Sequence, residues 1–141
     1  MKTILLILLG FSTLTWSAFH RDTNNVVVDE VTGLEWQDDA QVGNNVNNFS
    51  WQDAIDQCEV LNIGGHDDWR LPNINELMSI ANYYTSTPSI DATFQNTLSD
   101  AYWSSTGYTF DHQEAWYLDF SEGFTYKHVK GTLKYVRCVR N

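Results

Sequence analysis

Alternating and helically spaced apolar residues divide the chain into a first half with two short helices and a second half made of strands. Apolar residues recur at three- and four-residue steps after Ser50 and again after Asn73, which is the spacing of one helix face. Apolar and polar residues alternate over 102–106, 115–120 and 134–140, which is the period of a half-buried strand. These patterns predict an α+β domain in which two short helices pack on a twisted antiparallel sheet.

The first helix is expected to begin at Ser50, whose hydroxyl oxygen can accept hydrogen bonds from free backbone amides. Gly64 and Gly65 are expected to end it, because glycine readily takes the left-handed conformation found after helix ends. The apolar face of this helix consists of Trp51, Ala54, Ile55, Cys58 and Leu61. Cys58 is therefore predicted to point into the core, where it can meet a strand that carries Cys138.

The stretch from Asp68 to Leu77 predicts a buried corner that leads into the second helix. Asn73 and the glutamate three residues later match the capping box of a helix start. Trp69 and Leu71 are expected to share one core with this helix, while Arg70 pairs with a carboxylate. Together with a tryptophan of the preceding segment, the residues assigned to this structural motif are Trp36, Trp69, Arg70, Pro72 and Glu76.

Residues 24–37 predict a β-hairpin, because valines at alternating positions precede a Thr32–Gly33 turn and further apolar residues follow it. Residues 38–48 are polar and rich in asparagine, so we expect a surface loop. Asp38 and Asp39 are expected to be solvated there, because the alternating acidic pattern of a calcium-binding loop is missing.

The second half predicts an antiparallel sheet. Strands over 102–106 and 115–120 are followed by a turn at 121–123, a third strand, and a last strand over 134–140. In the last strand the residues expected on one face are Val136 and Cys138, and those on the other are Tyr135, Arg137 and Val139.

The beginning of the sequence predicts a secretory signal peptide over residues 1–18. Lys2 precedes an apolar run from Ile4 to Leu14, and small residues follow up to Ala18. The run is shorter than the roughly 20 residues of a membrane-spanning helix. We therefore expect an exported protein, periplasmic, secreted or at the cell surface, with one domain over 19–141 and no membrane insertion after cleavage. An uncleaved N-terminal anchor is the alternative.

The charge of the chain is strongly acidic and unevenly distributed. The formal net charge is −10, and every Asp and Glu lies at or before Glu122. The basic residues of the C-terminal segment are Lys127, Lys130, Lys134, Arg137 and Arg140. An acidic body repels nucleic acid and anionic lipid, so a nucleic-acid partner is not expected.

The two cysteines, Cys58 and Cys138, predict a disulfide, because an even count in an exported chain favours a bridge. Two free thiols or a metal pair are the alternative, but zinc would need further His or Cys ligands at suitable spacing. The run His66–Asp68 is expected to be solvated for the same reason. We therefore predict no metal and no cofactor.

Catalysis is not predicted. Ser104, Ser105 and His112 could be imagined as a nucleophile and its base, but their spacing supports neither a nucleophile elbow nor an oxyanion loop.

A ligand surface is predicted instead near the C-terminus. Lys127, Lys130 and Lys134 fall at intervals of three and four around Gly131, so they are expected to project together and to hold a sulfate or carboxylate, with Arg137 extending the patch. The competing interpretation is that these cations only balance the acidic body, and it is favoured because unlike charges in an acidic domain pair without any ligand. The aromatic face around Trp103 and Trp116 is the next candidate surface.

These motifs together resemble the Lcl C-terminal domain family, which is named for the terminal domain of a collagen-like adhesin of Legionella. The stretches that carry the resemblance are Thr32–Gln37, the helix with Cys58, Asp68–Leu77, Tyr102–Thr106 and Tyr135–Arg140, and they cover nearly all of the predicted domain. The resemblance implies an exported bacterial domain with a fold similar to C-type lectins and the formylglycine-generating enzymes. The namesake binds sulfated glycosaminoglycans, whereas most members have no known role.

The sequence also departs from these related groups. It lacks the Glu-Pro-Asn and Trp-Asn-Asp calcium motifs of sugar-binding C-type lectins, the paired active cysteines of the formylglycine enzymes, and a collagen-like repeat. We therefore expect a non-catalytic binding or adhesion module for a glycan, a polyanion or another surface protein. The alternatives are a structural subunit of a periplasmic or surface assembly and an enzyme related to the formylglycine-generating group.

Overall fold

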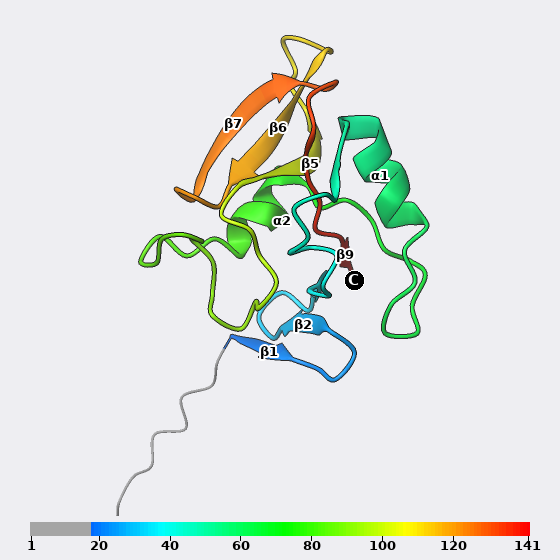
Figure 1. Cartoon of the computed structure of the whole chain (residues 1–141), viewed down its shortest axis with the longest axis vertical. Helices are drawn as coiled ribbons and strands as arrows, with labels where there is room; N and C mark the ends of the chain where they lie inside the picture. Colours follow the sequence, from blue (N-terminus) through cyan, green and yellow to red (C-terminus); the bar gives the residue numbers. More distant parts are fainter. Residues whose placement is uncertain (1–17) are drawn as a thin grey trace, which may run out of the picture.

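A computed structural model describes residues 18–141 and shows an α+β fold with two short helices (Figure 1). The elements in chain order are β1 (Phe19–Arg21), β2 (Val26–Asp29), β3 (Glu35–Gln37), β4 (Asn48–Phe49), α1 (Trp51–Glu59), α2 (Ile74–Ser79), β5 (Ala101–Gly107), β6 (Glu114–Asp119), β7 (Phe124–Val129), β8 (Lys134–Tyr135) and β9 (Val139–Arg140). The signal-peptide prediction falls on residues 1–17, outside the described residues, and on Ala18. No helix of the described part is both long enough and apolar enough to cross a membrane.

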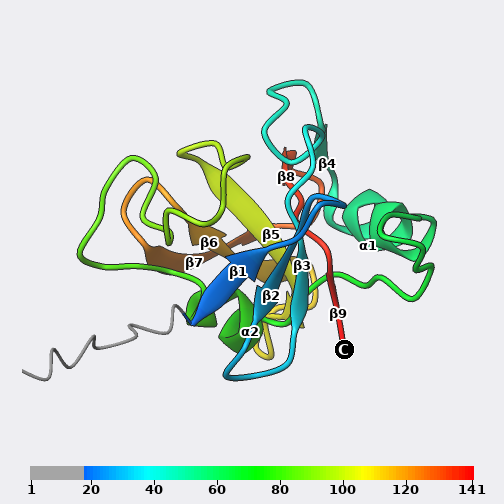
Figure 2. The ribbon, with the colours of Figure 1, turned by 90° about the horizontal axis from the view of Figure 1, so that it is seen from below.

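The strands form two sheets, not the single sheet that the sequence predicted. One sheet has the order β1-β2-β3-β9 and the other has the order β4-β8-β5-β6-β7. The pairing is antiparallel except between β5 and β8, which run parallel. In Figure 1 the β5–β6–β7 part and the β1–β2 part lie at opposite ends of the molecule, and Figure 2 shows β9 beside β3 and α1 at one side.

The predicted last strand is interrupted, and this interruption joins the two sheets. Residues 134–140 contribute β8 to one sheet and β9 to the other. Between them, the amide of Cys138 donates to Oε1 of Gln37, and the amide of Gln37 donates to the carbonyl of Cys138. The backbone therefore leaves the β8 ladder, bonds to the end of β3 and continues as β9.

Local signals placed the hairpin and both helix starts correctly. The predicted hairpin is β2–β3, with Val26 opposite Gln37. Ser50 accepts a hydrogen bond from the amide of Asp53, and Asn73 forms the predicted capping box at α2. The first helix nevertheless ends at Glu59, earlier than expected. The amide of Val60 still donates to the carbonyl of Asp56, but the amide of Leu61 donates to Cys58, only three residues back, which closes a tighter turn.

The interior contains two clusters. The disulfide core consists of Val26, Ala54, Cys58, Trp69, Leu71, Trp103, Ala115, Val136 and Cys138. The α2 core consists of Val27, Trp36, Val42, Leu77, Ile80, Ile90, Phe94, Tyr102, Leu118, Phe120 and Val139. The cysteines are joined, with Cα atoms 5.5 Å apart, so the predicted disulfide is confirmed.

The corner before α2 connects these two cores, so the prediction of one shared core is wrong. Trp69 and Leu71 lie in the disulfide core, whereas Leu77 of α2 lies in the α2 core. The backbone of Arg70 exchanges both hydrogen bonds with Val139, which fixes the corner against β9. The predicted pairing of Arg70 with a carboxylate is confirmed, because its guanidinium contacts both oxygens of Glu76 at 2.8 Å.

Two further predictions are wrong: that Asp38 is solvated and that Arg137 extends the lysine patch. Both side chains are fully buried. Nη1 of Arg137 donates to Oδ1 of Asp38 at 2.9 Å, and Arg21 also bonds to this carboxylate. Burial lowers the pKa of Arg137 to about 10, so the guanidinium stays charged at neutral pH. A buried charge requires an opposite charge and hydrogen bonds, which explains why Asp38 is not solvated and why Arg137 does not reach the surface.

Candidate functional site

Three aromatic rings form a row across neighbouring strands of the larger sheet. Trp103 of β5 lies opposite Tyr117 of β6, and Tyr117 lies opposite Tyr126 of β7. The ring centroids are 6.0 Å apart in the first pair and 5.8 Å apart in the second. Directly opposite residues share one face of a sheet, so these rings are neighbours on a single face. Trp103 is buried at the inner end, while Tyr126 is exposed at the outer end.

Two more exposed rings continue this row along the edge of the sheet. Phe124 precedes Tyr126 by two residues on β7, so both side chains point to the same face. The ring of Tyr83, from the segment after α2, lies 6.4 Å from the ring of Phe124. We call Tyr83, Trp103, Tyr117, Phe124 and Tyr126 the aromatic surface.

Lys134 lies directly over the row. Its Nζ is 3.8 Å from the ring centroid of Tyr117 and 5.1 Å from that of Trp103, a geometry in which the aromatic rings attract the ammonium. Only 8 % of Lys134 is exposed. Burial lowers the pKa of Lys134, although the nearby carboxylates of Asp100 and Asp119 act in the opposite direction. Across residues 18–141, no oxygen accepts a hydrogen bond from this Nζ.

The other two lysines of the predicted patch are occupied elsewhere. Nζ of Lys127 donates to Oε2 of Glu114 at 2.7 Å, and this bond raises the pKa of Lys127. Nζ of Lys130 donates to the carbonyl of His112 at 2.9 Å and lies over the ring of Trp51. The three lysines therefore contact different groups instead of projecting together.

The two tryptophans proposed for one surface lie on opposite faces of the sheet. Trp116 pairs with Lys127, and this pair is next to the pair of Tyr117 and Tyr126 along the two strands. Successive pairs point to opposite faces of a sheet. Its ring contacts Tyr108 at a centroid distance of 5.7 Å. Trp116 thus belongs to a separate surface, whereas Trp103 is the buried end of the aromatic row.

The sequence prediction missed the outer part of the aromatic surface. A turn at 121–123 implies that Asp119 pairs with Phe124, and therefore that Tyr117 pairs with Tyr126. The sequence thus contained enough information for that pair. The contacts of Tyr83 and Lys134 depend on segments that are distant in the chain and carried no such signal.

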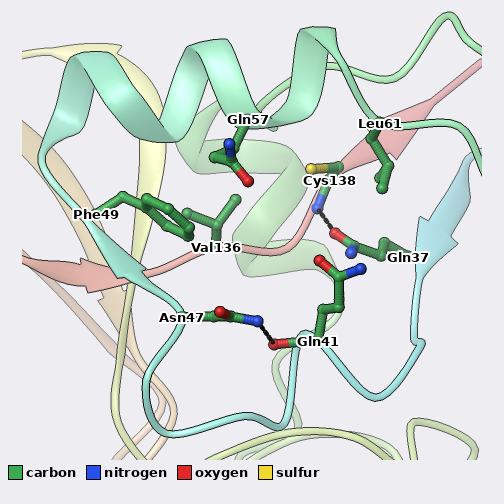
Figure 3. Close-up of a pocket in the computed structure, with 8 residues that line it drawn as sticks. All are labelled: Gln37, Gln41, Asn47, Phe49, Gln57, Leu61, Val136 and Cys138. Carbon is green, nitrogen blue, oxygen red and sulfur yellow. Dashed lines mark hydrogen bonds between the residues drawn. The ribbon is translucent and has the colours of Figure 1, made fainter.

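A small pocket beside the disulfide is lined by four carboxamide side chains and an apolar wall (Figure 3). Its residues are Gln37, Gln41, Asn47, Phe49, Gln57, Leu61, Val136 and Cys138. The volume is about 30 Å³, which is enough for on the order of one or two water molecules. The pocket is therefore too small for a sugar ring.

A larger groove of about 390 Å³ separates the two helices. Its lining residues are Ile55, Glu59, Arg70, Leu71, Asn73, Glu76 and Ser105. Because Arg70 and Glu76 already neutralise each other, the groove lacks the unpartnered cation that distinguishes the aromatic surface.

The described residues assemble no metal centre, and the hydroxyl of Ser104 is engaged within the sheet. No three side chains among the His, Cys, Asp and Glu residues of 18–141 gather to hold a metal ion. Oγ of Ser104 donates to the carbonyl of Trp116 at 2.7 Å, so this hydroxyl is part of the sheet bonding.

A comparison with protein families gives the family of the chain. The family model described as the Lcl C-terminal domain matches residues 25–140. The chain belongs to this family. The match confirms the resemblance seen in the sequence, and it includes both cysteines, both helices and every strand of the aromatic surface. A search of curated proteins finds no match.

The structure adds the residue detail, namely a ring surface with one buried lysine over it.

Proposed function

We propose that this Lcl C-terminal domain is a non-catalytic binding module of an exported bacterial protein, and that it recognises a glycan on the aromatic surface. The carbon-bound hydrogens of a sugar ring form an apolar face that can pack on an aromatic ring. Tyrosine hydroxyls can bond to the sugar hydroxyls at the same time. Resemblance to an adhesin domain that binds glycosaminoglycans supports a glycan as the ligand class.

The observation that carries this proposal is the exposure of neighbouring rings at the sheet edge. Phe124 is 58 % exposed, Tyr83 is 57 % exposed and Tyr126 is 41 % exposed. Exposed apolar side chains that stand singly are ordinary, whereas a contiguous group favours a contact site. Hydrogen bonding of the Tyr126 hydroxyl to Glu122 fixes one of these rings in position. A surface that is already ordered binds with a smaller entropic cost.

We also propose that the fold belongs with the C-type lectins and their relatives. This proposal is supported by the pair of short helices and by the disulfide from α1 to the segment before the last strand. The formylglycine-generating alternative has no support, because both cysteines of the chain are joined to each other.

A glycan array probed with the exported, disulfide-bonded protein tests the proposed function. Tyr126→Ala combined with Phe124→Ala should abolish binding, because both rings lie on the aromatic surface. Phe110→Ala is the matched control, since Phe110 is 88 % exposed and contacts Tyr108, outside this surface. Equal binding by the parent and the double variant, or binding to no glycan on the array, would refute the proposal.

A second candidate, a structural subunit of a surface assembly, is favoured by the position of β7. This strand is the last of its sheet, and Val129 at its end is half exposed. An unpaired edge can receive a strand from another chain. Native mass spectrometry of the purified protein separates the candidates, because a stable oligomer would support the assembly.

A further inference from the structure

The inference concerns Lys134 and rests on the proposed function. We infer that Lys134 is the specificity-determining cation of the aromatic surface, and that the ligand is a sugar bearing one anionic group, a carboxylate or a sulfate, whose oxygens accept hydrogen bonds from Nζ.

The first argument is that Lys134 differs from the other cations of the domain. The remaining Lys and Arg residues of 18–141 all donate to an oxygen: Arg21, Arg70, Lys127, Lys130, Arg137 and Arg140. Lys134 is as strongly buried as a core residue, with 8 % exposure, but it has aromatic rings as neighbours in place of an acceptor. The Lys134 side chain is packed along its length, but Nζ is not among the fully enclosed unpartnered atoms of residues 18–141, so an anionic oxygen can reach it. Because the rings already hold this ammonium in place, binding an anionic oxygen orders less of the protein here than at a freely rotating surface lysine.

The second argument is the position of the ammonium relative to the rings. Nζ lies 3.8 Å from the centroid of Tyr117, in the middle of the row that ends at the exposed Tyr126. A sugar packed on Tyr126 would therefore extend over Tyr117 and bring a ring substituent toward Lys134. The rings hold the sugar, and the ammonium distinguishes a charged sugar from a neutral one.

The third argument limits the number of anionic groups. Asp100 and Asp119 are close enough to Lys134 to act on its pKa, and each already accepts a backbone hydrogen bond. These carboxylates repel further negative charge, and the whole chain is acidic. One anionic group at Lys134 is therefore favourable, whereas a densely charged chain across the surface is not.

A structural role alone is the competing explanation, because the methylene groups of lysine also cover apolar rings. Lys134→Met keeps the length and the packing over Tyr117 while removing the charge and the donors. Lys134→Arg keeps the charge. Lys127→Gln is the control for general charge, because Lys127 is bound to Glu114 on the opposite face of β7.

The test compares matched sugars with the exported protein and these variants. The probes are a uronic-acid oligosaccharide and its methyl ester, and a sulfated oligosaccharide with its desulfated form. The parent should bind at least one acidic form about tenfold or more tightly than its neutral counterpart, since an ionic hydrogen bond is worth on the order of one such factor. Lys134→Met should reduce acidic binding to the neutral level, Lys134→Arg should retain part of the preference, and Lys127→Gln should match the parent.

The two acidic probes identify which anionic group is recognised, and salt dependence measures how many groups take part. A single contact should lose about tenfold or less in affinity for a tenfold rise in salt, whereas a polyanion contact falls far more steeply. Equal binding of acidic and neutral forms, an unchanged preference in Lys134→Met, or a steep salt dependence would overturn the inference. Binding of neutral sugars that Tyr126→Ala removes would still leave the proposed function intact. Failure of all four sugars to bind would overturn the inference, whereas the proposed function would fall only if no glycan on the array bound.

Discussion

The carboxylate of Asp38 binds segments that are far apart in the chain. It is fully buried and accepts hydrogen bonds from Arg21, from Arg137 and from the backbone amides of Gln95 and Asn96. These partners come from the first strand, the segment before β9 and the loop before β5. One side chain therefore fixes the N-terminal strand and a long loop against the C-terminal segment.

Replacing Asp38 should destabilise the domain strongly. Asp38→Asn keeps the shape but leaves the buried guanidinium of Arg137 without its countercharge, for which we expect a loss of about 3–5 kcal/mol in the free energy of unfolding. Urea unfolding followed by tryptophan fluorescence measures this loss. Asp39→Asn, at the neighbouring acid, is the control and should cost far less. A loss below about 1 kcal/mol for Asp38→Asn would mean that the pair is not required.

The sequence predicted a solvated Asp38, whereas the structure buries it, and the error has a physical cause. Its immediate neighbours are polar, and a pair of adjacent acids in a polar stretch is usually solvated. The residue that changes this outcome, Arg137, lies 99 positions later. Local composition contains no information about a partner at that distance. The role of Asn73 as the cap of α2 was predictable, in contrast, because the amide that it caps lies within the next turn.

At the scale of single elements, α2 shows how one carboxylate serves two purposes. Glu76 accepts a hydrogen bond from the amide of Asn73 and a bidentate contact from Arg70. The first interaction satisfies a free amide at the helix start, and the second fixes the preceding corner. The hydrogen bond from Arg70, followed by that from Asn73, lowers the pKa of Glu76 below its ordinary value of 4.5.

This pKa shift predicts an acid-dependent loss of stability. Because the pKa of Glu76 is lower in the folded state, its ionised form favours folding above the ordinary value, and this contribution disappears as the pH falls through the folded pKa. Glu76→Gln should therefore be less stable than the parent at neutral pH, and the difference should narrow below about pH 4. Unfolding free energies measured from pH 7 to pH 3 test this. Arg70→Met should show the same narrowing, and a constant difference across the range would contradict the assignment.

The elements predicted correctly are those with local end signals, and the errors occur where such signals are absent. The β2–β3 hairpin has a turn at Thr32–Gly33, and both helices have capping residues. The alternation over 134–140 fits one long strand as well as two short ones. Only the bonds of Gln37 to Cys138, made with a distant strand, decide between them.

At the scale of the whole molecule, one prediction concerns metal ions. The described residues gather no group of three or more side chains that could ligate one. We therefore predict that folding is independent of calcium and zinc. The melting temperature should be the same, within a degree or so, in excess calcium and in a chelator, because a ligand that binds only the folded state would raise it. A shift of many degrees would reveal ligands contributed from separate loops.

The disulfide provides the strongest prediction at this scale, because Cys58 and Cys138 are 80 positions apart and connect α1 to the segment that passes between the two sheets. Cys58→Ala combined with Cys138→Ala should lower the free energy of unfolding by about 2–5 kcal/mol, mainly because the unfolded chain is no longer restricted by a large loop. Urea unfolding of the parent with and without reductant should show the same loss, and alkylation with mass measurement should label no thiol before reduction. Free thiols in protein from an oxidising compartment would contradict the pairing.

The position of the disulfide also predicts whether the variant without it keeps the ligand preference of the parent. The rings of Tyr117 and Trp103 that contact Lys134 lie on β5 and β6, which pair with each other and contain neither cysteine. A double variant that still folds in the cold should therefore retain the ligand preference of the parent.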